Sequence, residues 1–244
     1  MSGIIINPYI YAGSSFVNEY SLDFDGSDDY VSAGTYTGLN ATDTFSISMW
    51  IKMPSGGGGM VVGKNNTASY WSKRFDYKIT ESTIEVNTAS LAFRNTGLSL
   101  ATDTWMHIAM VIDRGESTQL DRCKIYKDGA AVTNITNANF AQVTVDASPL
   151  ILGARQVGTA SPVINTPFEG NIDEISIWSN ALTSGEVSDI YNSGSPTDLT
   201  GETGLINWWR NGDGATYPTI PDEVGSNNGT MTNMVSGDIV ANVP

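Results

Sequence analysis

Two adjacent acidic residues, Asp173 and Glu174, are of the type that hydrolyses glycosidic bonds. Retaining glycosidases place two carboxyl groups about 5 Å apart across the sugar linkage. The pair lies in a run, 172–178, that predicts a strand, and neighbouring strand residues point to opposite faces. The only histidine, His107, lies in the apolar run 105–113, where we expect a core residue and not a general base. Nucleophile and zinc-protease motifs are absent from the sequence. We therefore predict that the chain is not an enzyme.

Metal binding has more support from the spacing of acidic residues. Asp23, Asp25, Asp28 and Asp29 fall within seven residues around a turn. Calcium takes about six to eight oxygen ligands from carboxylates and loop carbonyls, and this density exceeds what a turn needs. The alternative is that Asp25 and Asp28 hydrogen-bond the nearby backbone as Asx-turns. A structural calcium is the cofactor that we expect, and no organic cofactor.

Loop aromatics offer a surface for carbohydrate. Sugars stack on aromatic rings, while amides, carboxylates and backbone groups meet their hydroxyls. The predicted glycan-binding residues are Asn65, Asn66, Tyr70 and Trp71, beside the glycine run 56–59, which we expect to be a flexible loop. The alternative is that Trp71 closes one end of the hydrophobic core.

The overall composition limits the classes of partner. The chain has 244 residues, with 26 acidic against 12 basic side chains and a formal net charge of -14. This charge repels nucleic acid and anionic membranes, and no apolar run approaches a membrane span, so we expect neither nucleic-acid binding nor membrane insertion. Cys123 is the only cysteine, and the start of the sequence shows no signal peptide. Together these features favour a microbial or viral protein.

The pattern of apolar residues predicts the elements that position these groups. Residues 45–53 alternate apolar and polar positions, and 105–113 reads as a strand buried on both faces. Asp128-Gly129 is a hairpin turn, and turn signals recur about every 8–12 residues, as in a sandwich or jelly roll. Ser184 and Glu186 start a short amphipathic helix that we expect to end at Gly194.

The segment FEGNIDEISIWSNALTSGEVSDIYNSG (168–194) resembles the closing part of laminin-G-like, concanavalin A-like jelly rolls, with their F-x-G-x-I-D-E strand and A-L-x-x-x-E helix. SLDFDGSDDYV, FSISMWIK, TWMHIAMVID, KIYKDG and LILGAR follow the order of the other strands of that family. The resemblance covers about residues 20–194. It implies an all-β, two-sheet antiparallel jelly-roll sandwich with one short helix near 183–192.

The resemblance also has implications for the site and for the C-terminus. In this fold the first and closing strands are neighbours, so Asp173 is expected near the aspartate turn. The predicted calcium ligands are therefore Asp25, Asp29 and Asp173. The segment 204–234 matches material that precedes the first strand in many relatives. We expect it to pack beside the N-terminal strands and to complete one domain, residues 19–244.

Residues 1–18 stand apart as an apolar segment. They are either an edge strand or an arm that docks onto a neighbouring subunit, and the predicted assembly residues are Ile4, Ile5, Ile6, Tyr9, Ile10 and Tyr11. The style of the sequence resembles laminin-G-like proteins of marine tailed phages. We therefore predict a virion structural protein, a capsid decoration or fibre-associated component, that assembles with itself and other virion proteins at the virion surface or in an extracellular setting. The alternative is a lectin-like adhesin that binds cell-surface glycans.

Overall fold

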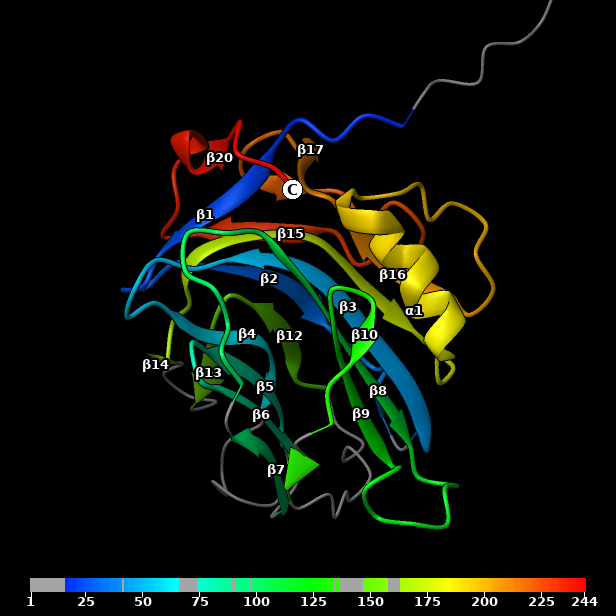
Figure 1. Cartoon of the computed structure of the whole chain (residues 1–244). Helices are drawn as coiled ribbons and strands as arrows, with labels where there is room; N and C mark the ends of the chain where they lie inside the picture. The colour runs from blue at the N-terminus through cyan, green and yellow to red at the C-terminus, as the bar shows by residue number, and fades with distance from the viewer. Residues whose placement is uncertain are drawn as a thin grey trace, which may run out of the picture.

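The computed structural model describes residues 16–40, 42–65, 74–88, 91–96, 98–133, 135–136, 147–157 and 163–244. Its strands form two antiparallel layers packed face to face (Figure 1). The layers are joined where Glu169 pairs with Gly58. This two-layer arrangement confirms the predicted all-β sandwich.

The first layer has β15 (Glu169–Trp178) near its centre. One edge of β15 pairs with β3, and the other edge pairs with β1 and then with β16. The further strands continue from β3 through β8 and β9 to β10, and β20 pairs with β1. The bounds are β1 (Ser21–Asp25), β3 (Thr44–Lys52), β8 (Met106–Asp113), β9 (Cys123–Lys127), β10 (Ala130–Ala131), β16 (Leu205–Trp209) and β20 (Ile239–Val240).

The second layer runs from β18 through β19, β2, β12, β4, β5, β6 and β7 to β11. The bounds are β2 (Tyr30–Thr35), β4 (Gly58–Asn65), β5 (Arg74–Thr80), β6 (Thr83–Thr88), β7 (Leu91–Thr96), β11 (Ile135–Thr136), β12 (Pro149–Leu152), β18 (Thr219–Ile220) and β19 (Gly229–Thr232). A separate hairpin joins β13 (Arg155–Val157) to β14 (Val163–Asn165), and β17 is Asn211–Gly214.

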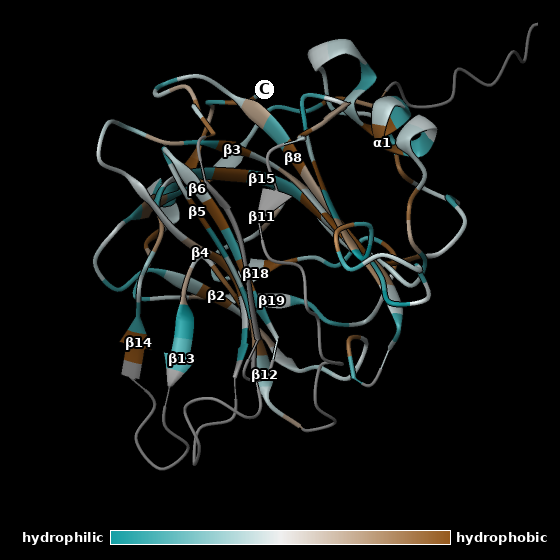
Figure 2. Ribbon diagram, turned by 60° about the horizontal axis from the view of Figure 1, so that its bottom comes forward, coloured by the Kyte–Doolittle hydropathy of each residue, from teal (hydrophilic) through white to brown (hydrophobic). Residues whose placement is uncertain are grey.

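The main core lies between the two layers, where alternate residues of each strand point inward. Phe45, Ile47, Met49 and Ile51 of β3 are almost fully buried there and meet Phe75 and other residues of the opposite layer. Figure 2 shows hydrophobic residues concentrated along the strands that face one another. The predicted period of two in residues 45–53 is thus the pattern that builds this core.

The C-terminal segment contributes strands to both layers. In the first layer β16 pairs with β15, with Trp209 opposite Ile175, and in the second layer β19 pairs with β2, with Met231 opposite Val31. Trp209 points into the main core, whereas Trp208 belongs to a smaller apolar cluster on the outer face. Strand alternation predicts this division between consecutive tryptophans.

The helix α1 (Ser184–Tyr191) lies over the outer face of the first layer (Figure 1). Thr183 and Glu186 form a capping box at its start, and Val187 and Ile190 pack on the outer cluster with Trp178. The helix ends earlier than expected, because Asn192 takes the left-handed conformation at its C-cap. Single 3-10 turns follow at η1 (Asn192–Gly194) and η2 (Ser236–Asp238). Among the described residues, we find no helix with the length and apolar character of a membrane span.

The glycine run 56–59 is not wholly a loop. Gly58 and Gly59 begin β4, and a Cβ on Gly59 would lie 2.1 Å from the carbonyl oxygen of Pro167. Close backbone packing, and not chain flexibility alone, therefore requires glycine at this position.

Candidate functional site

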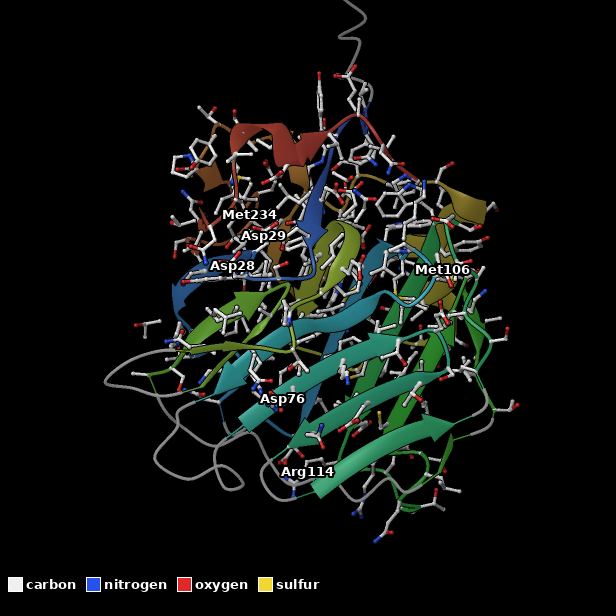
Figure 3. The ribbon with its side chains drawn as sticks, turned by 90° about the vertical axis from the view of Figure 1, so that its left-hand side faces the viewer. Asp28, Asp29, Asp76, Met106, Arg114 and Met234 are labelled. Atoms are coloured by element: carbon white, nitrogen blue, oxygen red, sulfur yellow. The ribbon has the colours of Figure 1, made fainter. Side chains whose placement is uncertain are left out.

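The aspartate turn joins β1 to β2 and brings three carboxyl groups together. Asp25, Asp28 and Asp29 each offer an oxygen, and these atoms lie within 4.8 Å of one another. Gly26 takes φ +74°, and its N–H donates to the carbonyl of Phe168, which fixes the turn against the start of β15. Figure 3 shows Asp28 and Asp29 at this turn, near Met234.

The same turn also uses some of these oxygens internally. Asp25 Oδ1 accepts from the N–H groups of Ser27 (2.7 Å) and Asp28 (3.4 Å), and Asp29 Oδ2 accepts from the N–H of Asp25 (3.0 Å). The Asx-turn alternative is therefore present in the structure. The remaining carboxylate oxygens of the three residues are of the hard type that calcium prefers.

Burial and neighbouring carboxylates raise the pKa values of aspartates at this turn. Burial raises the pKa of Asp29 to about 6; its hydrogen bond from the Asp25 N–H opposes the rise, and the charges of Asp25, Asp238 and Asp28 add to it. The pKa of Asp23 is also raised, first by burial and then by Asp238 and Asp25. A bound cation would offset this repulsion between carboxylates.

Asp173 lies outside this group, which corrects its prediction as a ligand beside Asp25 and Asp29. The register of β1 on β15 pairs Asp25 with Glu169, four residues before Asp173. Asp173 instead lies opposite Trp50 of β3, and its Oδ2 accepts from Asn18 Nδ2 at 2.9 Å. The two strands are neighbours as expected, but their register separates these aspartates.

A β-bulge also alters the prediction for Glu174. The pairing of β15 with β3 shifts between Asp173 and Ser176, and Glu174 has φ +51°. Glu174 accepts from Trp208 Nε1 (2.5 Å) and Arg210 Nε (3.2 Å). Simple strand alternation therefore fails at this bulge, and the charge of Asp213 acts on the carboxyl groups of both Asp173 and Glu174. Both residues are buried, at 0% and 4% exposure, so neither faces an open substrate site.

A polar cleft of about 390 Å³ lies beside the aspartate turn. A chain of side-chain hydrogen bonds crosses it: Asn171 Nδ2 donates to Asp23 Oδ1 (3.3 Å), and Asn242 Nδ2 donates to Asn171 Oδ1 (3.0 Å). Asn242 Oδ1 accepts in turn from Lys52 Nζ and Trp105 Nε1, each at 3.3 Å. The lining side chains with charge or amide groups are Asp23, Asp25, Lys52, Asp103, Glu169, Asn171 and Asn242.

Sequence reasoning did not find this cleft as a unit. Asp23 and Asp25 belonged to the predicted turn, and Asn171 to the closing segment, but Asn242 lies 71 residues further along the chain. The short pairing of β20 with β1 brings the C-terminus to this place. A two-residue strand of this kind has little sequence signal.

The predicted glycan-binding and arm residues lie largely outside the described part of the chain. Asn65 ends β4, where its backbone pairs with Arg74, whereas Asn66, Tyr70 and Trp71 lie outside the described residues. The arm residues Ile4, Ile5, Ile6, Tyr9, Ile10 and Tyr11 also lie outside them. These assignments stay predictions.

The model of the concanavalin A-like lectin/glucanases superfamily matches residues 25–188, which is more than half of the chain. The chain belongs to this superfamily. The matched region includes the aspartate turn, β15 and most of α1, while β16 and the later strands follow it in the sequence.

Solved structures share the superfamily fold at low sequence identity. A putative carbohydrate binding protein from Bacteroides ovatus is 18% identical, with a TM-score of 0.63, covering 89% of this chain and 59% of that one. A pentraxin from Limulus polyphemus is 13% identical, with a TM-score of 0.55 and coverages of 73% and 84%. The CBM40 of a Ruminococcus gnavus sialidase is 14% identical, with a TM-score of 0.53 and coverages of 70% and 96%.

One curated relative is a much longer protein. Adhesion G-protein coupled receptor V1 of Danio rerio is 21% identical over 193 residues, which cover 72% of this chain. The match spans only 3% of the receptor's length. This relative therefore supports the domain assignment and carries no whole-protein activity to this chain.

Proposed function

We propose that this domain is a non-catalytic lectin-like module that binds carbohydrate in the polar cleft. The observation that carries the proposal is the cleft-crossing network of Asn171, Asn242, Asp23 and Lys52. Sugar hydroxyls both donate and accept hydrogen bonds, and this network presents amide, carboxylate and ammonium groups on one surface. The Bacteroides protein named as carbohydrate binding and the sialidase CBM40, which has been solved with alpha2,3 sialyllactose, support this choice by their fold alone.

The charge of the cleft favours neutral sugars. Asp23, Asp25, Asp103 and Glu169 face a single lysine, Lys52, among the described lining residues. A sialic or uronic acid carboxylate would meet this negative field and would lose more in repulsion than one lysine returns. We therefore expect binding of neutral oligosaccharides and exclusion of acidic ones.

Calcium is proposed at the adjoining turn, with Asp25, Asp28 and Asp29 as the ligands. Asp25 also lines the cleft, so a cation bound at the turn would lie at the cleft's edge. Its charge would neutralise the crowded carboxylates and fix the turn against β15. Calcium would then strengthen sugar binding by ordering one wall of the cleft.

The test is a glycan array followed by calorimetry on the best neutral oligosaccharide, with and without calcium. Asn242→Ala removes the amide at the centre of the network, and we expect binding to weaken at least tenfold. Gln119→Ala, on an exposed loop outside the cleft, is the matched control and should bind as the wild type does. The cleft proposal fails if Asn242→Ala binds normally. If Trp71→Ala abolishes binding instead, the sugar site is the predicted loop patch.

A role in assembly on a virus particle stays a separate proposal based on the apolar segment 1–18. It is supported by the firm anchoring of the segment's last residues: the Phe16 ring stacks on Trp208 with centroids 6.1 Å apart, and Asn18 binds Asp173. Deleting residues 1–13 should leave the domain folded and abolish self-association or particle attachment. Normal assembly by the truncated protein would exclude the arm.

A further inference from the structure

Residues 16–20 lie across the outer side of the first layer as a strap that belongs to no strand. The strap is held mainly by side chains of the domain. Asn18 Nδ2 donates to Asp173 Oδ2 (2.9 Å), and the N–H groups of Glu19 and Tyr20 donate to Asp213 Oδ2 (3.0 and 3.4 Å). Arg210 donates to the carbonyl of Val17. The anchors of the strap are therefore ionisable groups.

The carboxyl cluster beneath the strap consists of Asp173, Glu174 and Asp213. Arg210 is its cation: Nε binds Glu174 at 3.2 Å and Nη2 binds Asp213 at 3.2 Å. The guanidinium also lies 4.4 Å from the centroid of the Phe16 ring, so the strap covers the ion pairs. Three acidic groups thus share one arginine in a buried place.

The other elements packed around the cluster bring no further positive charge among the described residues. On the β3 side Asp173 faces Trp50, and beyond it lies His107, whose pKa is lowered to about 4 by burial. His107 is therefore neutral near pH 7. On the other side, hydrogen bonds from Thr200 lower the pKa of Asp198, and the charge of Arg210 adds only a small further lowering. Glu19 of the strap itself is exposed and acidic.

We propose that the strap is a pH-sensitive latch: it is closed while the carboxyl cluster holds a proton and opens when the cluster loses it. Half-buried Asn18 lies on Asp173, and Phe16 lies on Trp208, so opening the strap admits water to Asp173 and Glu174. Water stabilises the ionised forms, and opening is therefore linked to deprotonation.

The direction of the linkage follows from the cause of the shifts. Burial is the largest cause that raises the pKa of Asp173, well above its ordinary value, and of Glu174, to about 7. Groups with raised values bind protons more tightly in the closed state. The closed strap is therefore favoured at acidic pH, and this advantage is lost as the pH rises from about 4.5 to about 7. The latch would thus couple pH to the docking of residues 16–20 on the domain.

Hydrogen exchange of the full chain tests the latch, because the Glu19 and Tyr20 amides are protected only when the strap is closed. Exchange is measured from pH 5 to pH 8 and corrected for the intrinsic rate. We expect the protection of these two amides to fall at least tenfold over this range, while amides of β3 keep theirs. Unchanged protection of the strap from pH 5 to pH 8 would overturn the proposal.

Two isosteric variants test whether ionisation of the carboxyl cluster causes the pH dependence. Asp173→Asn and Glu174→Gln each remove ionisation and keep one of the two acceptor oxygens, and each should flatten the pH profile of strap protection. Asp189→Asn, which removes an exposed carboxyl group on α1 away from the cluster, is the matched control and should keep the wild-type profile. If Asp173→Asn does not fold, Glu174→Gln and the wild type still decide the outcome. A wild-type profile in both cluster variants would refute the latch.

Discussion

His107 offers a direct test of how burial controls ionisation in this domain. Its side chain is fully buried, Nε2 lies 2.7 Å from Ser48 Oγ, and the ring packs against both Trp50 and Tyr191, which also stack on each other. Burial lowers its pKa from 6.5 to about 4, although the charge of Asp128 opposes the shift. The imidazole is therefore neutral in the folded protein over a range where the unfolded chain takes up a proton.

The size of the change in the free energy of unfolding follows from this difference in pKa. Between pH 6.5 and about pH 4 the unfolded state gains a proton that the folded state lacks, so the free energy of unfolding falls as the pH is lowered. A difference from 6.5 to about 4 corresponds to about 3 kcal/mol in favour of unfolding at the acidic end. This loss is a large fraction of the stability of a typical domain.

Urea unfolding of the wild type and of His107→Gln, at intervals from pH 7 to pH 4, measures the effect. Glutamine can still bond Ser48 but does not titrate, so the variant loses a constant amount of packing energy. We expect the gap in stability between the two proteins to shrink by about 3 kcal/mol as the pH falls, while carboxylates affect both alike. A gap that is independent of pH, or an imidazole NMR titration centred near 6.5 in the folded protein, would refute the reasoning.

Three further predictions concern the calcium proposal and local structure. Chelation of calcium should lower the melting temperature of the wild type, because a ligand that binds only the folded state stabilises it by mass action. Asp28→Asn should reduce this response. Calorimetry with and without chelator measures both effects. Gly170→Ala should destabilise the domain by about 3 kcal/mol or more in urea unfolding. Gly170 has φ +131°, and the new Cβ would lie 2.2 Å from the carbonyl oxygen of Lys52. An effect below about 1 kcal/mol would contradict this prediction. Thr183→Ala should cost about 1 kcal/mol by removing the N-cap of α1, with Ser188→Ala on the exposed face as the control, and equal stability of the two variants would argue against the cap.

The fold was predictable because its signals are local. Strand alternation in 45–53, the Asp128-Gly129 turn and the closing segment 168–194 each depend on neighbouring residues, and their order identified the sandwich. The aspartate turn was predictable for the same reason, since Asp25, Asp28 and Asp29 lie within five positions.

The errors arose where distant strands determine the result. Glu174 takes a left-handed conformation that a glutamate rarely adopts, so no local preference announces the bulge that moves it beside Asp173. The register of β1 on β15 likewise follows from the packing of Phe24 and Ile172 in the core, and it alone decides that Asp25 meets Glu169. Asn242 reaches the cleft only through β20. Sequence patterns identify strands, whereas these sites depend on their pairing.

The acidic groups of the domain are consequently of two physical kinds. At the rim, Asp25 and Asp28 are exposed, and the proposed calcium would offset their charge. Beneath the strap, Asp173 and Glu174 are buried; Arg210 pairs with Glu174, and burial raises the pKa of both carboxyl groups, which favours their protonation. The two responses should therefore separate: calcium should alter stability with little effect on strap protection at fixed pH, and a change from pH 5 to pH 8 should open the strap with or without calcium. If calcium closed the strap at pH 8, the two groups would be coupled through β15 and would have to be treated as one site.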